Sequence, residues 1–220
     1  MNNFDVSAAG QSSAIELNKV LKNTYNLLAM TLLFSAFMAS ISIMMHVPAM
    51  VGLICNIVAI GLLWFVLPKY ANSAKGLPLV FAVTGLLGFG LGPLLQHYLA
   101  MENGPKIIAT AMGGTGVIFL GLSAYALTTK KDFNFLGGFL VVGMLVCFGA
   151  MIANLFFQIP ALSLAISAVI IMVFSGFILY DTSQMIRGEQ TNYILMTISL
   201  YLSILNIFTS LLHILGITSD

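Results

Sequence analysis

Charged residues are scarce in this chain. Asp, Glu, Lys and Arg together make up 7% of its 220 residues and hydrophobic residues 60%, whereas an ordinary soluble domain has about 25% charged residues. A water-soluble fold of this length could not bury so much apolar surface. The formal net charge is only +1, and no basic patch is interleaved with aromatic residues, so we expect no nucleic-acid partner.

The motifs of common catalytic centres are also missing. The sequence has no HExxH, GxSxG or P-loop pattern, and no pair of Asp residues on facing helices of the kind an intramembrane protease uses. Gly113, Gly114 and Gly116 lie inside an apolar run and do not follow a strand, so they do not form a phosphate-binding loop. We therefore expect a protein that is not an enzyme and that binds no cofactor.

Residues that could bind a metal are few and isolated. Cys55 and Cys147 stand alone in apolar runs, without CxxC spacing, and we interpret them as small buried hydrophobic residues. His46, His97 and His213 fall near the ends of apolar runs, where they could sense pH or join in a metal site. Because no ligand spacing supports a joint site, we interpret them as scattered interfacial residues and expect no metal.

Long apolar runs dominate what is present. Each is long enough to cross a hydrocarbon core of about 30 Å at about 1.5 Å per helical residue. The sequence therefore predicts an all-α membrane protein, a seven-transmembrane helix bundle in membrane lipid, within a domain spanning residues 23–220. The seven predicted spans are 24–45, 48–67, 77–99, 106–128, 135–157, 160–182 and 191–216.

The basic residues are distributed unequally between the two sides of these spans. With the N-terminus in the cytoplasm, only Lys106 lies outside, as the positive-inside rule requires. An odd number of spans then places Asp220, at the C-terminus, in the periplasm. The basic residues predicted on the cytoplasmic side are Lys19, Lys22, Lys69, Lys75, Lys130, Lys131 and Arg187.

The segment before the first span, residues 1–22, is polar and rich in Ser, Asn and Ala. It has too few apolar residues to form a core, so we expect a flexible cytoplasmic N-terminal tail. Such a tail is either a passive terminus or a segment that a partner takes up. Its first residues, which a partner would grip, are Met1, Asn2, Asn3, Phe4 and Asp5.

The last predicted span carries a polar stripe. Its polar residues recur at steps of three, four and seven, which places them on one face of an α-helix. Because polar groups that face lipid lack partners, this face should look into the bundle, and we expect the last helix to be the central one. The stripe consists of Asn192, Ser199, Ser203, Asn206, Ser210 and His213.

Asp181 lies where the sixth apolar run meets the following loop. A carboxyl group at membrane depth is costly and marks a functional site, such as a proton or cation relay. The alternative is a helix-end carboxylate that reaches solvent and pairs with Lys130, Lys131 or Arg187. The sequence leaves both interpretations open.

The C-terminal part of the chain, from residue 177, resembles the signature of the Bax inhibitor-1 family. The similarity lies in FILYDTSQMIRGEQTN at 177–192, its continuation to 208, and LLHILG at 211–216. The chain is similar in particular to the bacterial YccA branch, and the resemblance extends from about residue 17 to the end. It implies seven spans with a central last helix. The stretches that resemble this branch are 19–25, 91–95, 123–138 and 153–168.

The resemblance implies two functions. Some bacterial members of the family are proton-gated calcium leaks that use two facing aspartates; the first matches Asp181, but Ser203 stands at the second position. Two carboxyl groups can share a proton, and a carboxyl group with a hydroxyl cannot. The YccA branch instead modulates the membrane-anchored ATP-dependent protease FtsH, which it inhibits by occupying it. We therefore expect an inner-membrane modulator of FtsH, or alternatively a pH-sensitive calcium or proton leak with Asp181, Ser203 and Asn206 as sensing residues.

Overall fold

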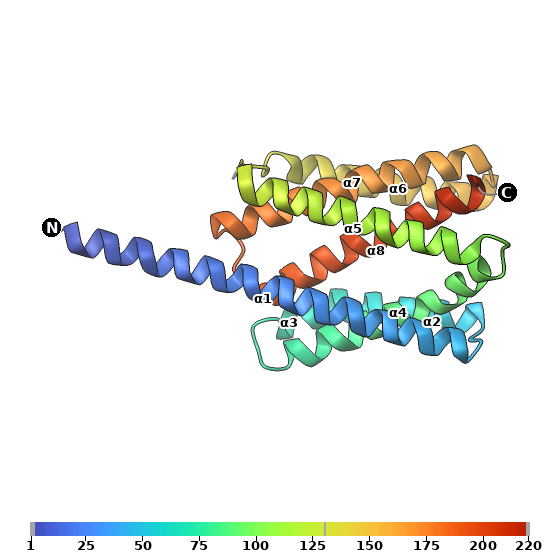
Figure 1. Ribbon diagram of the computed structural model, residues 1–220, viewed down its shortest axis with the longest axis horizontal. Coiled ribbons are helices and arrows are strands. Elements are labelled where there is room, and N and C mark those ends of the chain that lie inside the picture. Colours follow the sequence, from blue (N-terminus) through green and yellow to red (C-terminus); the bar gives the residue numbers. More distant parts are fainter. Residues whose placement is uncertain (1–2, 130, 219–220) are drawn as a thin grey trace.

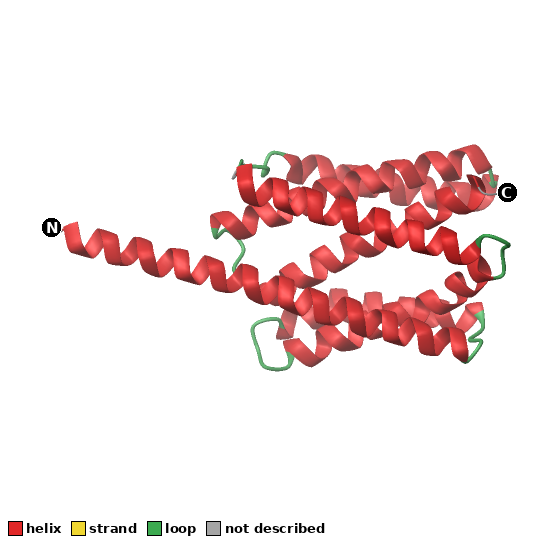
Figure 2. Cartoon of the chain, in the orientation of Figure 1, coloured by secondary structure: helices red, strands yellow, loops and turns green. Residues whose placement is uncertain are grey.

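The described part of the chain is almost entirely helical (Figure 2). The computed structural model describes residues 3–129 and 131–218, with side chains from Glu16 onward, and these residues form no strand. The elements are α1 (Asn3–Met44), α2 (Ala49–Gly61), the π-helical turn η1 (Leu62–Val66), α3 (Leu67–Tyr70), α4 (Gly76–Leu99), α5 (Gly104–Thr129), α6 (Leu136–Phe157), α7 (Pro160–Arg187) and α8 (Tyr193–Thr218).

The prediction of an all-α protein with seven spans is confirmed. Within the described part of the chain, seven helical segments are long and apolar enough to cross a membrane, and the second of them, Ala49–Tyr70, combines α2, η1 and α3. The π-helical turn directly precedes Leu67 and Pro68. Proline has no N–H to donate within a helix, and a local π-helical turn is one way for a helix to continue past such a defect.

The described N-terminal segment has a helical backbone. The sequence predicts a flexible tail over 1–22, whereas the structure has a helical backbone from Asn3 that continues without interruption into the first span. No proline interrupts α1, and Ala8 and Ala9 favour helix. The first span supplies an existing helix, so extending it toward the N-terminus avoids the cost of a new helical nucleus. In Figure 1 this part of α1 projects beyond the other helices.

The spans form two groups with the last helix between them. In Figure 1, α1 to α4 lie on one side, α5 to α7 on the other, and α8 crosses diagonally between the two groups. Accordingly, α8 packs against α1 and α4 of the first group and against α5 and α7 of the second. Among the helix pairs that pack closely, α2 contacts α4, and α6 contacts α7. These contacts support the central position predicted for α8.

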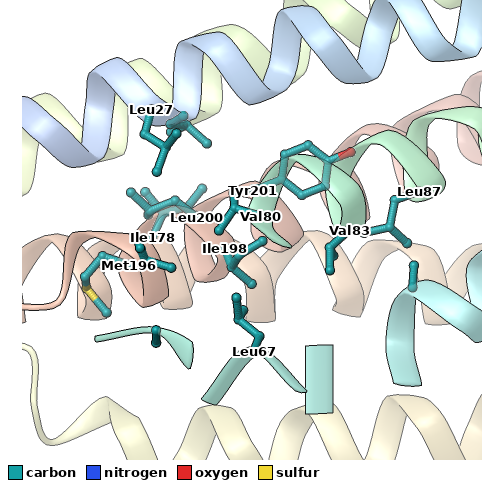
Figure 3. Packing of buried hydrophobic residues seen from close by; sticks show 14 of the residues in the cluster. Leu27, Leu67, Val80, Val83, Leu87, Ile178, Met196, Ile198, Leu200 and Tyr201 are labelled. Carbon is teal, nitrogen blue, oxygen red and sulfur yellow. The ribbon is translucent and has the colours of Figure 1, made fainter. Parts of the chain in front are cut away.

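The core follows from this arrangement. In the most apolar part of α8, 50% of the residues are buried, whereas in the corresponding part of α6 only 11% are buried. α8 therefore faces protein, and α6 faces mainly lipid. The main cluster of buried side chains gathers around α8 (Figure 3). It joins α1, α4, α7 and α8 through residues that include Leu27, Val83, Ile178, Leu200 and Tyr201.

Small residues let α1 and α4 approach closely. A side chain at Gly88 would collide with the backbone of Ser35, and one at Gly92 would collide with Ser42. Gly88 and Gly92 are four residues apart and so lie on one face of α4, and this face packs against α1.

A short connection joins α7 to α8. Gly188 caps the C-terminal end of α7, and its φ of +73° belongs to the left-handed region that glycine adopts most easily. The side chain of Asn192 then accepts hydrogen bonds from the backbone N–H groups of Ile194 and Leu195, which caps the start of α8. The two helices therefore run antiparallel, and the C-terminal part of α7 faces the N-terminal part of α8.

Candidate functional site

Asp181 is buried between α7 and α8. It lies six residues, about 9 Å along the helix, before the end of α7, and only 3% of its surface is exposed. The hydroxyl of Ser199 on α8 donates a hydrogen bond to Asp181 Oδ2 at 2.6 Å. The antiparallel connection brings these two residues together across 18 positions of sequence. The carboxyl group thus faces the interior of the bundle.

Ser203 lies next to this pair. Its side chain is 1% exposed, and its hydroxyl donates a hydrogen bond to the backbone carbonyl of Ser199, one turn earlier, at 3.1 Å. Ser199 therefore connects the two positions that the sequence singled out, Asp181 and Ser203. Asn206, the third candidate, donates to the carbonyl of Leu202 on its own helix at 2.8 Å. The polar stripe of α8 thus contributes Ser199 and Ser203 to the surroundings of Asp181.

Arg187 has partners other than Asp181. Its Nη2 lies 3.1 Å from Asp132 Oδ2, and its Nε donates to Glu189 Oε1 at 2.8 Å. Arg187, one of the three possible partners named for Asp181, instead belongs to a cluster at the bundle surface. Asp181 lies inside the helix pair, whereas the side chain of Arg187 is 41% exposed. Of the other expected partners, Lys131 accepts a hydrogen bond from Ser183 through its backbone carbonyl, and residue 130 lies outside the described residues.

The Arg187 cluster joins two loops at one end of the bundle. Asn134, in the loop between α5 and α6, donates to Glu189 in the loop between α7 and α8. The hydrogen bond from Arg187, together with the one from Asn134, holds the pKa of Glu189 below its ordinary value. The side chains of Arg187, Asp132 and Glu189 are exposed and Asn134 is partly buried, and we interpret the cluster as a clasp between the loops.

The predicted N-terminal handle lies at the start of α1. Asn3, Phe4 and Asp5 belong to the helical backbone, and their side chains are outside the description. Residues 1 and 2 lie outside the described residues.

Tyr201 is an interior polar residue that the sequence reasoning missed. Its side chain is 1% exposed; its hydroxyl lies 2.6 Å from Ser35 Oγ on α1 and donates to the carbonyl of Thr84 on α4 at 3.3 Å. It therefore connects α8 to both helices of the first group. A tyrosine in the middle of an apolar span was the available signal, since a buried phenol requires a partner.

The histidines do not meet at one place. His213 on α8 lies 2.9 Å from Ser167 Oγ on α7, while His46 lies in the turn before α2 and His97 near the end of α4. Among the described residues, no three His, Cys, Asp or Glu side chains lie close enough to hold a metal ion. Where the side chains are described, the interior offers one buried carboxyl group, which accepts a hydrogen bond from the hydroxyl of Ser199, with Ser203 one turn further along α8; such a group suits the handling of a proton or cation.

Comparison with known proteins agrees with this architecture. The family described as "Inhibitor of apoptosis-promoting Bax1" matches residues 17–220. A protein of Vibrio cholerae described as "Uncharacterized membrane protein" is 53% identical over 206 residues, which cover 94% of this chain and 92% of that protein. The Escherichia coli K12 protein "Modulator of FtsH protease YccA" is 48% identical over 219 residues, which cover 100% of this chain and 99% of that protein. A second Escherichia coli strain has "Inner membrane protein YccA", with the same identity and coverage.

The match includes all seven spans and both residues of the Asp181–Ser199 pair. The resemblance seen in the sequence is therefore confirmed, and the chain belongs to the Bax inhibitor-1 family.

Proposed function

We propose that this protein is an integral inner-membrane protein that modulates the membrane-anchored ATP-dependent protease FtsH. The observation that carries the proposal is the 48% identity over 100% of the chain to a protein named as a modulator of that protease. In this proposal the protein performs no catalysis. It inhibits FtsH by being engaged readily and extracted slowly, so that it occupies the enzyme.

The proposed orientation places the N-terminus in the cytoplasm and the C-terminus in the periplasm. The end of the bundle from which α1 projects carries Lys19, Lys75, Lys131 and Arg187, whereas Lys106 lies at the opposite end, near the start of α5. The positive-inside rule assigns the first end to the cytoplasm. A periplasm-specific reporter should be silent when fused beside Lys131 and active when fused after the last residue; the reverse pattern would contradict this orientation.

The projecting part of α1 supplies the proposed handle, beginning at Met1, Asn2, Asn3, Phe4 and Asp5. Residues 3–15 form the free end of α1 and project beyond the rest of the bundle in Figure 1. Helix ends fray at little cost in free energy, so this segment can be unwound from its N-terminus. An ATP-driven protease can grip such a segment although it is helical in the isolated protein.

The bundle behind the handle resists extraction. The same helix continues into the core, where Thr24, Leu27, Leu28 and Thr31 are each at most 2% exposed. α1 packs against α4, α7 and α8, so pulling it out would separate helices of both groups and expose buried polar groups to lipid. Easy engagement followed by slow extraction is the combination that the proposal requires.

The test is the lifetime of the protein in cells with and without FtsH. Deleting residues 2–15 removes the handle but retains Leu17, which contacts Gly188, so the bundle should still fold and insert. The truncated protein should live longer than the full-length protein when FtsH is present, and the two should have equal lifetimes when it is absent. A matched control replaces residues 2–15 by a Gly/Ser segment of the same length and should restore rapid turnover. Equal lifetimes of the truncated and full-length proteins in the presence of FtsH would overturn the handle mechanism.

The alternative function is a pH-sensitive calcium or proton leak. The burial of Asp181 within a membrane span favours it. With Ser203 in place of a second carboxyl group, the pair lacks the shared proton of a two-aspartate gate. Ser203→Asp should therefore create or sharpen a pH-dependent calcium flux in liposomes, and Asp181→Asn in that background should remove it. Equal fluxes from the wild type and both variants between about pH 6 and 8 would rule out this pair as a gate.

A further inference from the structure

A cavity of about 460 Å³ lies between α1, α4, α5 and α8. α1 and α5 each pack against α4, α7 and α8, and they stand apart on either side of α8 in Figure 1. Ala36 on α1 and Met112 on α5 line the cavity and are also exposed at the surface. The cavity is therefore a groove that opens sideways between α1 and α5, with α8 as its floor.

The groove opens at membrane depth. Ala36 lies eight residues before the end of α1 and Met112 eight residues after the start of α5, which places both about 12 Å from the nearer end of the bundle. Along α1 the groove extends from Leu32 to Ile43, or about 16 Å. That length is about half of a hydrocarbon core of roughly 30 Å, the share that the chains of one lipid leaflet occupy.

The walls offer an apolar surface without free hydrogen-bonding groups. The hydroxyls of Ser35 and Tyr201 bond to each other, and Tyr201 also donates to a backbone carbonyl. Ser40 and Thr115 donate to backbone carbonyls one turn earlier. A cavity of this kind stays dry and binds apolar molecules, and its volume falls within the range of about 300–1,000 Å³ typical of small-molecule sites.

We propose that this groove binds the hydrocarbon chain of a membrane lipid, which enters from the bilayer between α1 and α5. The groove is continuous with the lipid-facing surface, since Leu33 and Val117 beside its mouth are 73% and 74% exposed. A transmembrane helix of another protein, about 10–12 Å across, would need a trough along the whole span, whereas the groove occupies only one half of it.

Gly116 provides a way to fill the groove. It lines the groove from α5, and a Cβ atom at this position would meet no heavy atom within 4 Å. Gly121 on the same helix has equally open space but does not line the groove. Gly116→Phe should therefore occupy the site of the lipid chain, and Gly121→Phe is its matched control. Ala36→Phe narrows the mouth from α1 and serves as a second variant if Gly116→Phe does not fold.

The experiment uses the full chain in liposomes that contain a phospholipid with a photoreactive diazirine near the end of one acyl chain. After irradiation, mass spectrometry maps the labelled residues, and circular dichroism and size-exclusion chromatography verify the fold of each variant. Ile204 and Leu205 on the floor should be labelled in the wild type and in Gly121→Phe. In Gly116→Phe their labelling should fall several-fold, while that of lipid-facing Val117 stays unchanged.

Two results would overturn the proposal. The first is an unlabelled floor in the wild type, or equal labelling of the floor in a folded Gly116→Phe or Ala36→Phe variant. The second comes from a photo-crosslinking amino acid introduced in place of Met112 in cells: crosslinks to another protein chain instead of lipid would identify a protein helix as the occupant.

Discussion

Removing the hydroxyl of Ser199 tests whether Asp181 is held by α8. This hydroxyl donates to the carboxyl group of Asp181 at 2.6 Å, across the interface of α7 and α8. Ser203 on the same face of α8 is a buried serine, whereas Ser199 is partly buried, and the hydroxyl of Ser203 bonds to the backbone of its own helix. Ser199→Ala and Ser203→Ala therefore delete the same group from neighbouring turns, and only the first removes an interhelical hydrogen bond.

The two variants should differ in free energy of unfolding. Leaving a buried polar group without its partner costs about 1–3 kcal/mol, and Asp181 is 3% exposed, so we expect Ser199→Ala to lose about that amount. In Ser203→Ala the carbonyl of Ser199 keeps its helical partner, and a hydroxyl that bonds back to its own helix contributes little or is slightly unfavourable. We expect that variant to lose less than about 1 kcal/mol.

The assay is unfolding in mixed micelles by titration with SDS, from which the free energy of unfolding of each variant is obtained. Circular dichroism before the titration verifies that both variants retain the helical content of the wild type. Equal losses in the two variants, or a larger loss in Ser203→Ala, would refute the assignment of Ser199 as the residue that positions Asp181.

Two further predictions concern packing and the loop clasp. Gly88→Ala should lower the free energy of unfolding by about 1–3 kcal/mol because the new methyl group collides with the backbone of Ser35. Gly121→Ala, whose methyl group enters open space, should raise the free energy of unfolding by up to about 1 kcal/mol because alanine favours helix more than glycine does. The same SDS titration measures both variants, and equal effects would contradict the close packing at Gly88. Arg187→Gln should raise the pKa of Glu189 toward its ordinary value of 4.5, as measured by NMR titration. In the wild type the pKa of Glu189 is lowered, so the clasp should stabilise the folded protein above about pH 4.5, and this stabilisation should be lost as the pH falls through the pKa of the folded state. An unchanged pKa of Glu189 in Arg187→Gln would show that Arg187 does not cause the shift.

The N-terminal segment shows how the conformation of a polar segment depends on its neighbour. A polar composition predicts that residues 1–22 form no core, and in Figure 1 their N-terminal part indeed projects away from the bundle. The same composition does not reveal that a neighbouring span can extend its helix into the segment, as α1 does from Asn3. The reason is cooperativity: the conformation of a short segment depends on whether its neighbour is already helical.

The surroundings of Asp181 were partly predictable. The sequence identified this carboxyl group and the polar stripe of α8, because both depend on residue type and helical period alone. It did not identify Ser199 as the hydrogen-bond partner of Asp181. Nor did it show that Arg187 pairs with Asp132 and Glu189. Those pairings depend on the relative register of α7 and α8 and on where the loop between α5 and α6 lies, and spacing along one helix contains neither.

The sequence by itself determined the class of the protein and the number of its spans, because a backbone in lipid must satisfy its hydrogen bonds within each segment and so forms helices at every long apolar run. Only the tertiary structure decided which helices meet. It places Tyr201 against Ser35 and Thr84, and it leaves α1 and α5 apart with a groove between them. The physical reason is that lipid solvates any apolar face as well as another helix does, so the contacts between helices depend on close packing and on hydrogen bonds between residues far apart in sequence.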